Sequence, residues 1–215
     1  MAGGNLRIIC GPTGAGKSRV ALALGEAYDA AIVTADSRQV YCYFDIGTAK
    51  PTREQCERVT HYGVDVIEPV ERYSAARWAT DAAEWIECAC EIDKTPVVVG
   101  GTGLYIKALI TPLFNSPEMD PGQRRELASD LDTKSLSELR VMCEQLDPPR
   151  AHLGRTQLVR AIETVLLAGA KISDLHAEQS STTAVDAGYE PHYLLIDPGE
   201  SLQSRIESRI DEMIG

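Results

Sequence analysis

The fold is decided by the segment Gly11-Pro12-Thr13-Gly14-Ala15-Gly16-Lys17-Ser18. It matches the pattern G-x-x-x-x-G-K-[ST] in full, which indicates a phosphate-binding P-loop when a strand precedes it and a helix follows. The apolar residues 6–10 predict a buried strand before the segment, and the spacing of Ala, Leu and Val in residues 18–28 predicts a helix after it. Both conditions are met, so the sequence predicts a binding site for a polyphosphate.

The residue types of this segment suit phosphate binding. Glycines let the backbone turn so that its N–H groups face the phosphate oxygens, and the helix N-terminus adds a favourable dipole. Lys17 supplies a positive charge, and the Ser18 hydroxyl can ligate Mg²⁺, which we expect as the cofactor. The pattern indicates a phosphate site without being specific for ATP. The expected diphosphate-binding residues are Gly11, Pro12, Thr13, Gly14, Ala15, Gly16, Lys17 and Ser18.

Further strands and helices alternate outward from the P-loop. Apolar runs at residues 30–35 and 95–99 predict two more strands, and residues 73–92 predict a long helix that Ser74 caps. Strand and helix in alternation are typical of a parallel sheet flanked by helices. The sequence therefore predicts an α/β fold of the P-loop NTPase-like type, with its core in residues 1–112.

The character of the sequence changes after residue 112. Prolines punctuate a polar stretch in which residues 123–131, 135–146 and 155–167 have helical spacing. We expect residues 113–170 to form a small helical insertion. Residues 171–215 are expected to return to the core, with a strand at 192–196 and a helix at 201–214. That last helix stops abruptly, so we expect a truncated end.

The composition fits a folded enzyme, with 44% hydrophobic and 25% charged residues among 215. The net charge of −11 argues against an extensive basic surface for nucleic acid but is compatible with a local basic patch. No apolar run approaches the roughly 20 residues that span a bilayer, and a signal peptide is not evident, so we expect a cytoplasmic protein without membrane contact. The scattered cysteines predict reduced thiols, and the histidines have no metal-ligand spacing.

The ends of the other strands indicate what the phosphate site does. A P-loop ATPase usually places a carboxylate after an apolar strand, but here residues 96–99 run into Gly100-Gly101-Thr102-Gly103. The carboxylate is Asp36, at the end of the second strand. Because the carboxyl ends of parallel strands meet at one edge, we expect Asp36, Thr102 and the P-loop to face one cleft. Asp36 is then a general base for group transfer, or it only caps the segment that follows it.

Five motifs in order resemble the tRNA dimethylallyltransferase family. After the P-loop come Asp36-Ser37-Arg38-Gln39-Val40-Tyr41 and Asp45-Ile46-Gly47-Thr48-Ala49-Lys50-Pro51. Tyr73-Ser74-Ala75-Ala76-Arg77 and Val99-Gly100-Gly101-Thr102-Gly103-Leu104-Tyr105 follow, and weaker similarity continues through residues 157–163 and 205–213. The resemblance covers nearly the whole chain.

This resemblance implies transfer of a dimethylallyl group from dimethylallyl diphosphate to N6 of the adenosine adjacent to the anticodon of a tRNA. It implies that the P-loop holds the prenyl diphosphate, that Asp36 accepts the N6 proton and that Lys17 stabilises the leaving diphosphate. Thr102 matches a position associated with substrate contact. Arg205 and Arg209 are candidates to reach the diphosphate, with Arg209 favoured. The target base has to leave its stack to react. The resemblance also implies that the helical insertion at residues 113–170 faces the tRNA. The residues expected at the tRNA are Asp36, Ser37, Arg38, Gln39, Gln157 and Arg160.

Several of these features have plainer interpretations. Residues 45–51 could form only a turn, and Lys50 and Arg38 could be solvated surface charges. Tyr41, Tyr43 and Phe44 could stack on a base or form a hydrophobic wall that needs no ligand.

Two departures from the family pattern keep other functions open. The segment at residues 152–158 lacks the Asn-Asp pair of the family's His-Pro-Asn-Asp-x-Gln-Arg motif, although Gln157 and Arg160 remain. Family members also usually continue beyond the position that matches Met213. An adenylate (AMP, ADP or ATP) isopentenyltransferase of the cytokinin type, a nucleotide kinase and a non-catalytic nucleotide-binding remnant therefore stay as alternatives. We expect a monomer.

Overall fold

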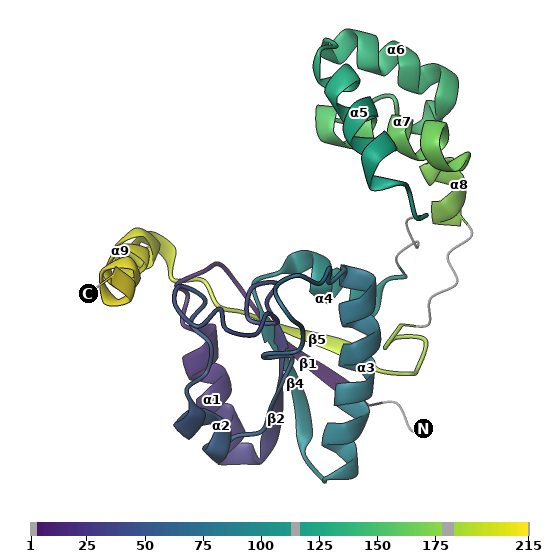
Figure 1. Ribbon diagram of the computed structural model, residues 1–215. Helices are drawn as coiled ribbons and strands as arrows, with labels where there is room; N and C mark the ends of the chain where they lie inside the picture. The colour runs from purple at the N-terminus through teal and green to yellow at the C-terminus, as the bar shows by residue number, and fades with distance from the viewer. Residues whose placement is uncertain (1–3, 113–116, 178–182, 215) are drawn as a thin grey trace. The chain divides into compact units, whose positions relative to one another are not determined.

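The computed structural model describes residues 4–112, 117–177 and 183–214 (Figure 1). The chain divides into two compact units, one made of residues 1–112 with 182–215 and one of residues 113–181. Among the helices of the described ranges, none combines the length and the apolar character that a bilayer crossing requires.

The first unit is built on a parallel five-stranded sheet in the order β3-β2-β4-β1-β5. Its strands are β1 (Asn5–Cys10), β2 (Ala30–Ala35), β3 (His61–Tyr62), β4 (Thr95–Gly100) and β5 (Glu190–Leu195). Its helices are α1 (Lys17–Tyr28), α2 (Arg53–Arg58), α3 (Ala75–Glu91), α4 (Gly103–Ile110) and α9 (Leu202–Ile214). Figure 1 shows α1 and α2 on one side of the sheet and α3 and α4 on the other.

Both faces of the sheet are buried because successive strand residues point to opposite sides. Ile8, Val33 and Val98 pack into a core with Trp78 of α3. Their neighbours along the strands pack into a second core on the α1 side, which contains Ile9, Ala21, Ile32, Val97 and Val99. This two-sided burial explains why β2 and β4 read in the sequence as continuous apolar runs.

Three strands end at the same edge of the sheet. Cys10 of β1 and Ala35 of β2 both lie opposite Gly100 of β4 in the pairing register. The residues that follow each strand therefore emerge side by side: the P-loop after β1, Asp36 after β2 and Gly101 after β4.

Gly100 is required where β4 passes β2. A Cβ atom at this position would lie 1.9 Å from the carbonyl oxygen of Ala35, which no real contact allows. We expect Gly100→Ala to lower the free energy of unfolding by about 3 kcal/mol. Gly103→Ala is the matched control, because nothing lies within 4 Å of a Cβ there, and it should change stability by less than about 1 kcal/mol. Equal urea midpoints for the two variants would contradict the steric argument.

The second unit is a small helical bundle. Its elements are α5 (Pro121–Asp132), α6 (Leu136–Leu146), η1 (Pro148–Arg150), α7 (Arg155–Ala168) and α8 (Ile172–Ala177). Side-chain caps mark two helix starts: Asp120 accepts backbone N–H groups ahead of α5, and Ser135 forms a capping box with Glu138 ahead of α6. The core of this unit consists of Leu131, Leu139, Cys143, Ala151, Leu158, Ala161, Ile162 and Ile172.

The predicted α/β fold with a parallel sheet is confirmed, and Ser74 caps α3 by accepting a hydrogen bond from the Arg77 N–H. Three details differ. The helical unit includes α8, which lies beyond the predicted end of the insertion at residue 170. β5 begins two residues before the expected strand. The sequence analysis also missed α2, α4 and the two-residue strand β3.

Candidate active site

A cavity of about 370 Å³ lies in the first unit, at the strand edge that carries the P-loop. It brings together Lys17 and Ser18 from the P-loop, Asp36 from the end of β2 and Arg209 from α9. The remaining lining residues are Thr13, Arg19, Ala21, Leu22, Ile32, Thr34, Gln39, Ala49, Pro51, Gln55, His61, Val99, Gly100 and Gly101. The first unit therefore gathers three cations, Lys17, Arg19 and Arg209, and one carboxylate around a single cavity.

A second cavity of about 560 Å³ shares Lys17, Ser18 and Arg209 with the first. Gly14 and Gly16 of the P-loop line it, and so do Asp45, Ile46, Gly47 and Ala49. We call residues 41–49 the wall loop, because residues of this loop line both cavities. The P-loop is thus bordered by open space on the side that faces the wall loop.

The P-loop backbone has the geometry that its glycines permit. Gly14 and Gly16 have φ values of 80° and 94°, in the left-handed region that a side chain disfavours. Gly16 caps the N-terminus of α1, and no acidic residue occupies the first turn of that helix. The first N–H groups of α1 and its dipole are therefore available to an anion.

Lys17 bends back over the P-loop. Its ammonium group donates hydrogen bonds to the carbonyl oxygens of Gly11 and Pro12, at 3.0 and 2.7 Å. Burial lowers the pKa of Lys17, Asp36 works against that shift, and the positive charge of Arg209 adds to it. A second cation that disfavours the charge on Lys17 is what a site awaiting an anion should contain.

Asp36 both shapes the turn after β2 and lines the cavity. Its Oδ1 accepts hydrogen bonds from the backbone N–H groups of Arg38 and Gln39, at 2.8 and 3.4 Å. Within the part of the chain that the structure describes, no hydrogen-bond partner is found for Oδ2. Capping and facing the site are therefore compatible roles for the two oxygens of one carboxylate.

Thr102 holds this turn from the neighbouring strand. Its hydroxyl oxygen accepts the backbone N–H of Ser37 at 3.0 Å, and its own N–H donates to the carbonyl oxygen of Ala35. Thr102 is not among the described residues that line either cavity. The structure thus brings Thr102 to the Asp36 turn, where it contacts the backbone.

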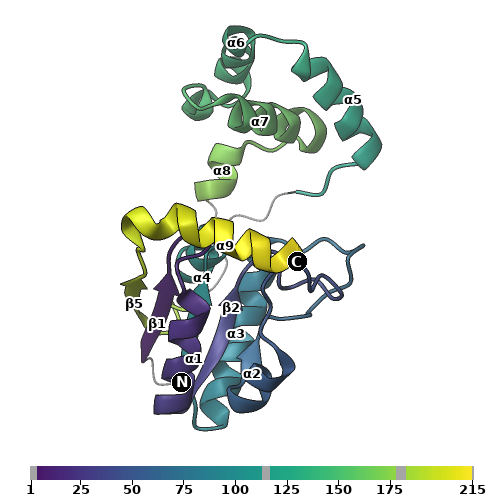
Figure 2. The ribbon, with the colours of Figure 1, turned by 90° about the vertical axis from the view of Figure 1, so that its left-hand side faces the viewer.

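Helix α9 brings both candidate arginines to the P-loop, and Figure 2 shows it crossing above α1 and the carboxyl ends of the strands. Arg205 donates to the carbonyl oxygen of Ala15 at 3.5 Å and to the Ser201 hydroxyl at 3.1 Å, and it lines the second cavity. Arg209 lines both cavities together with Lys17. Arg209 is therefore the arginine better placed for a phosphate group beside Lys17.

The arrangement of P-loop, carboxylate and arginine can be compared with known proteins. A family profile described as IPP transferase matches residues 39–215, and one described as isopentenyl transferase matches residues 4–65. The chain belongs to the IPP transferase family.

Individual relatives agree with this assignment. The tRNA dimethylallyltransferase of Thermotoga maritima is 38% identical over 97% of this chain and 68% of its own length. The structure of a eukaryotic dimethylallyltransferase acting on tRNA superimposes with a TM-score of 0.74, at 25% identity, over 99% of this chain and 53% of that one. For the tRNA delta(2)-isopentenylpyrophosphate transferase of Staphylococcus epidermidis the TM-score is 0.59, at 28% identity, over 99% of this chain and 70% of that one. The chain thus spans between about half and seven tenths of these relatives, and the predicted family resemblance is confirmed.

The residues predicted to face tRNA divide between the two units of this IPP transferase family member. Ser37 is half-buried and Arg38 is exposed in the turn after β2, whereas Gln39 is buried. Gln157 and Arg160 are exposed on α7 of the second unit, where the Gln157 side chain accepts the Gly154 N–H and so caps the helix. That these residues bind one RNA together with Asp36 stays a prediction.

The structure contradicts the interpretation of Lys50 as a solvated surface charge. Its side chain is only 6% exposed, and its ammonium group pairs with Asp45 and Asp65. The two carboxylates compensate for the loss of hydration, which explains how this charge can be buried. Tyr43 is exposed, as a residue that could stack on a base would be, whereas Tyr41 is half-buried.

Sequence reasoning missed several residues that line the cavity, among them Arg19, Gln55 and His61. A signal for Gln55 exists, because Thr52-x-x-Gln55 is a capping box that predicts the start of α2. His61 lies 2.8 Å, through Nδ1, from the carbonyl oxygen of Val59, and burial lowers its pKa. His61 therefore adds a neutral polar group to the cavity at neutral pH.

The two arginines of α9 should differ in their effect on anion binding by this family member. We expect Arg209→Gln to weaken the binding of inorganic diphosphate about tenfold, because one charged contact to an anion is worth about 1.5 kcal/mol. Arg205→Gln should weaken it by about twofold, since its guanidinium is engaged by Ala15 and Ser201. Isothermal titration calorimetry measures both constants, and a larger loss in the Arg205 variant would reverse the assignment.

Proposed function

We propose that the protein transfers a dimethylallyl group from dimethylallyl diphosphate to N6 of the adenosine adjacent to the anticodon of a tRNA. One observation carries the proposal: a single cavity holds the P-loop cation Lys17, a second cation on Arg209 and the carboxylate of Asp36. The cations can bind the diphosphate of the prenyl donor, and the carboxylate can accept the proton that has to leave the acceptor. The names of the relatives supply the acceptor, a tRNA.

In the proposed reaction the allylic C–O bond of the donor breaks and a bond forms from N6 to the same carbon. The oxygen keeps the electron pair and leaves with the diphosphate. Lys17, Arg209 and the N–H groups of the P-loop stabilise the negative charge that develops there. N6 becomes positively charged as it attacks, and Asp36 accepts one of its two protons through Oδ2. Transfer needs no further reactant.

The residues present fit a Mg²⁺ ion that is shared with the substrate. Ser18 lines both cavities at the N-terminus of α1, where its hydroxyl can ligate the ion. Among the described residues there is no cluster of three or more His, Cys, Asp or Glu that could hold a metal. A site with few protein ligands suits Mg²⁺, because this ion usually keeps several bound waters and takes most of its other ligands from substrate phosphates. When bound, the ion would neutralise part of the charge of the diphosphate.

The acceptor base has to be unstacked to enter the cavity, as for other enzymes that modify a base. Arg38, which is exposed beside Asp36, and Gln157 with Arg160 on the second unit are the residues we assign to RNA binding. An overall charge of −11 means that such contacts have to be local. We further expect the protein to act as a monomer in the cytoplasm.

The test is transfer of label from radioactive dimethylallyl diphosphate with Mg²⁺, with unmodified tRNA and AMP offered in parallel reactions. We expect label in tRNA, and we expect no label in a control tRNA that lacks the target adenosine. Label in AMP alone would move the protein to the adenylate isopentenyltransferases. Label in neither, with diphosphate binding intact, would contradict the proposed activity.

A further inference from the structure

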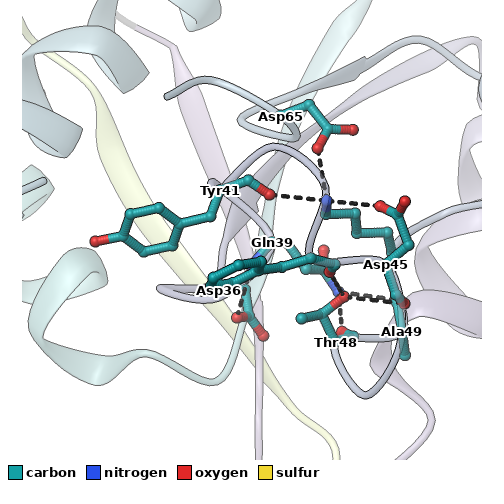
Figure 3. A network of polar contacts seen from close by, with 9 residues as sticks. Asp36, Gln39, Tyr41, Asp45, Thr48, Ala49 and Asp65 are labelled. Carbon is teal, nitrogen blue, oxygen red and sulfur yellow. Dashed lines mark hydrogen bonds and ion pairs between the residues drawn. The ribbon is translucent and has the colours of Figure 1, made fainter. Parts of the chain in front are cut away.

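Lys50 is a buried cation that the proposed chemistry does not use. Its ammonium group donates to the carbonyl oxygen of Tyr41 at 2.8 Å, to Asp45 at 2.8 Å and to Asp65 at 2.6 Å (Figure 3). Burial acts to lower the pKa of Lys50, but hydrogen bonds to the two carboxylates outweigh it and raise the pKa. The group is therefore charged throughout the neutral range, and each of its three N–H bonds has an acceptor.

These three acceptors come from different parts of the chain. Tyr41 begins the wall loop, Asp45 lies at its centre, and Asp65 belongs to the segment after β3. Backbone bonds tie that segment to the turn after β2, since the Asp65 N–H donates to the Gln39 carbonyl oxygen at 3.0 Å. Lys50 thus links the two ends of the wall loop to the rest of the first unit.

Gln39 makes a second, neutral link beside the first. Its side chain is buried, and its amide nitrogen donates to the carbonyl oxygens of Thr48 and Ala49, at 3.0 and 2.9 Å (Figure 3). The backbone N–H of the same Gln39 donates to the Asp36 carboxylate. One residue therefore joins the general base to the far end of the wall loop.

The wall loop does not hold its shape through its own backbone preferences. Tyr43 and Ala49 have φ values of 66° and 49°, and Asp65, which contacts Lys50, has a φ of 53°. Residues with a Cβ atom disfavour this left-handed region and keep it only where the surroundings impose it. In this loop the surroundings include the contacts of Lys50 and Gln39, together with the hydrogen bond from the Cys42 N–H to the Ile67 carbonyl oxygen.

The loop that these contacts hold forms part of the site. Asp45, Ile46, Gly47 and Ala49 line the second cavity opposite Gly14 and Gly16 of the P-loop, and Ala49 also lines the first. The position of the wall loop therefore sets the width of the space between this loop and the P-loop, and Gln39 joins the loop to the turn of Asp36. A displacement of about 1 Å misaligns the reacting groups enough to lower the rate of transfer about a hundredfold.

We propose that Lys50 is a positioning residue, which holds the wall loop, and through it the turn of Asp36, at the width that the transfer requires. This inference deepens the proposed function and rests on it for its effect on turnover. Lys50 itself touches no substrate in this proposal.

The test compares Lys50→Met with Lys94→Met. Lys94 is a matched control, because it pairs with Asp29 at 3.3 Å at the opposite edge of the sheet, where β4 begins. We expect Lys50→Met to lower kcat about 30-fold, counted per diphosphate-binding site. The dissociation constant for inorganic diphosphate should stay within about twofold, since the P-loop is untouched. Counting sites by calorimetric stoichiometry removes the effect of any unfolded fraction.

Cys42 gives a readout of the loop that is independent of turnover. It is half-buried inside the wall loop, whereas Cys88 on α3 is exposed and serves as the internal reference. We expect Lys50→Met to accelerate alkylation of Cys42 roughly tenfold relative to Cys88, measured by mass spectrometry of the peptides. Burial and the carboxylates of Glu68 and Asp65 raise the pKa of Cys42, and the charge of Lys50 lowers it by a smaller amount. Removing Lys50 would by charge alone slow alkylation, so acceleration reports an opened loop.

A triple variant separates positioning from simple charge balance. In Lys50→Met with Asp45→Asn and Asp65→Asn no carboxylate is left without a partner, yet the link is absent. Positioning predicts that kcat stays low and Cys42 stays reactive. Recovery of both would overturn the proposal, and so would a Lys50→Met variant that behaves like Lys94→Met.

If Lys50→Met does not fold, Asp45→Asn alone removes one of the three contacts and should show both effects at a few-fold size. A wild-type chain without turnover would contradict the proposed function, and Cys42 would still decide whether Lys50 holds the loop.

Discussion

Replacing Asp36 by asparagine is expected to lower kcat for dimethylallyl transfer by about 1,000-fold, the range in which a general base contributes. Asparagine keeps an oxygen that can accept the N–H groups of Arg38 and Gln39, so the turn after β2 should persist. It cannot accept the proton from N6. Binding of inorganic diphosphate should remain within about threefold or become tighter, because a negative charge beside an anion is removed.

Asp36→Ala is the companion to this variant. It removes the proton acceptor and the cap together, so its loss in kcat should equal that of Asp36→Asn, with an additional loss of stability of about 1 kcal/mol. Rates are measured as label in tRNA at saturating donor, and stability by urea denaturation. An Asp36→Asn variant that turns over at the wild-type rate would show that the carboxylate only caps the turn.

The second large effect is expected for Lys17→Met. Loss of this charge should weaken binding of inorganic diphosphate by about 100-fold, which corresponds to one strong charged hydrogen bond of nearly 3 kcal/mol. It should also lower kcat/KM by about 1,000-fold, because the charge on the leaving diphosphate exceeds that on the bound donor. Calorimetry and the transfer assay measure the two quantities separately. Unchanged diphosphate affinity would contradict the role of the P-loop.

The pH dependence of binding adds an independent check on Lys17. Its pKa in the free protein lies below the ordinary value of 10.5. Bound diphosphate favours the charged form of Lys17. The affinity for diphosphate should therefore be highest at pH values below that lowered pKa, and it should fall as the pH rises through it. Lys17→Met should lack this fall, and the ionisation of diphosphate itself is common to both proteins. In Arg209→Gln the fall should move to higher pH, because Arg209 no longer repels the charge on Lys17.

The strands and helices that could be predicted from the sequence are those whose burial is visible along the chain. β2 and β4 are apolar on both faces because each face meets a helix layer, and α3 carries its cap in Ser74. By contrast, α4 begins at Gly103 directly after three residues that read as a loop, and β3 has only two residues. A two-residue strand, or a helix that begins at a glycine after a glycine-rich stretch, leaves no periodic pattern of apolar residues in the sequence. Such elements are defined only by the packed structure.

The candidate site follows the same division. Lys17, Ser18 and Asp36 could be placed together because the carboxyl ends of parallel strands meet at one edge. The role of Lys50 could not be predicted, since its partners Asp45 and Asp65 lie 5 and 15 residues away and come together only through the fold. Thr102 holds the backbone of Ser37, and its expected contact with the substrate stays a prediction. A hydroxyl can serve either purpose, and the sequence does not distinguish them.

The pairing of β5 with β1 also determines when the phosphate site is completed during synthesis. β5 pairs with β1 from Glu190 opposite Asn5 to Leu195 opposite Cys10, so this pairing waits until residues 190–195 have been translated. At about 5–20 residues per second, this delay is on the order of ten to forty seconds. Arg209 follows still later, on α9. The helical unit, whose described core residues lie within 127–172, leaves the ribosome earlier and can fold first. The nascent chain therefore brings Arg209 to the P-loop only after the helical unit has emerged.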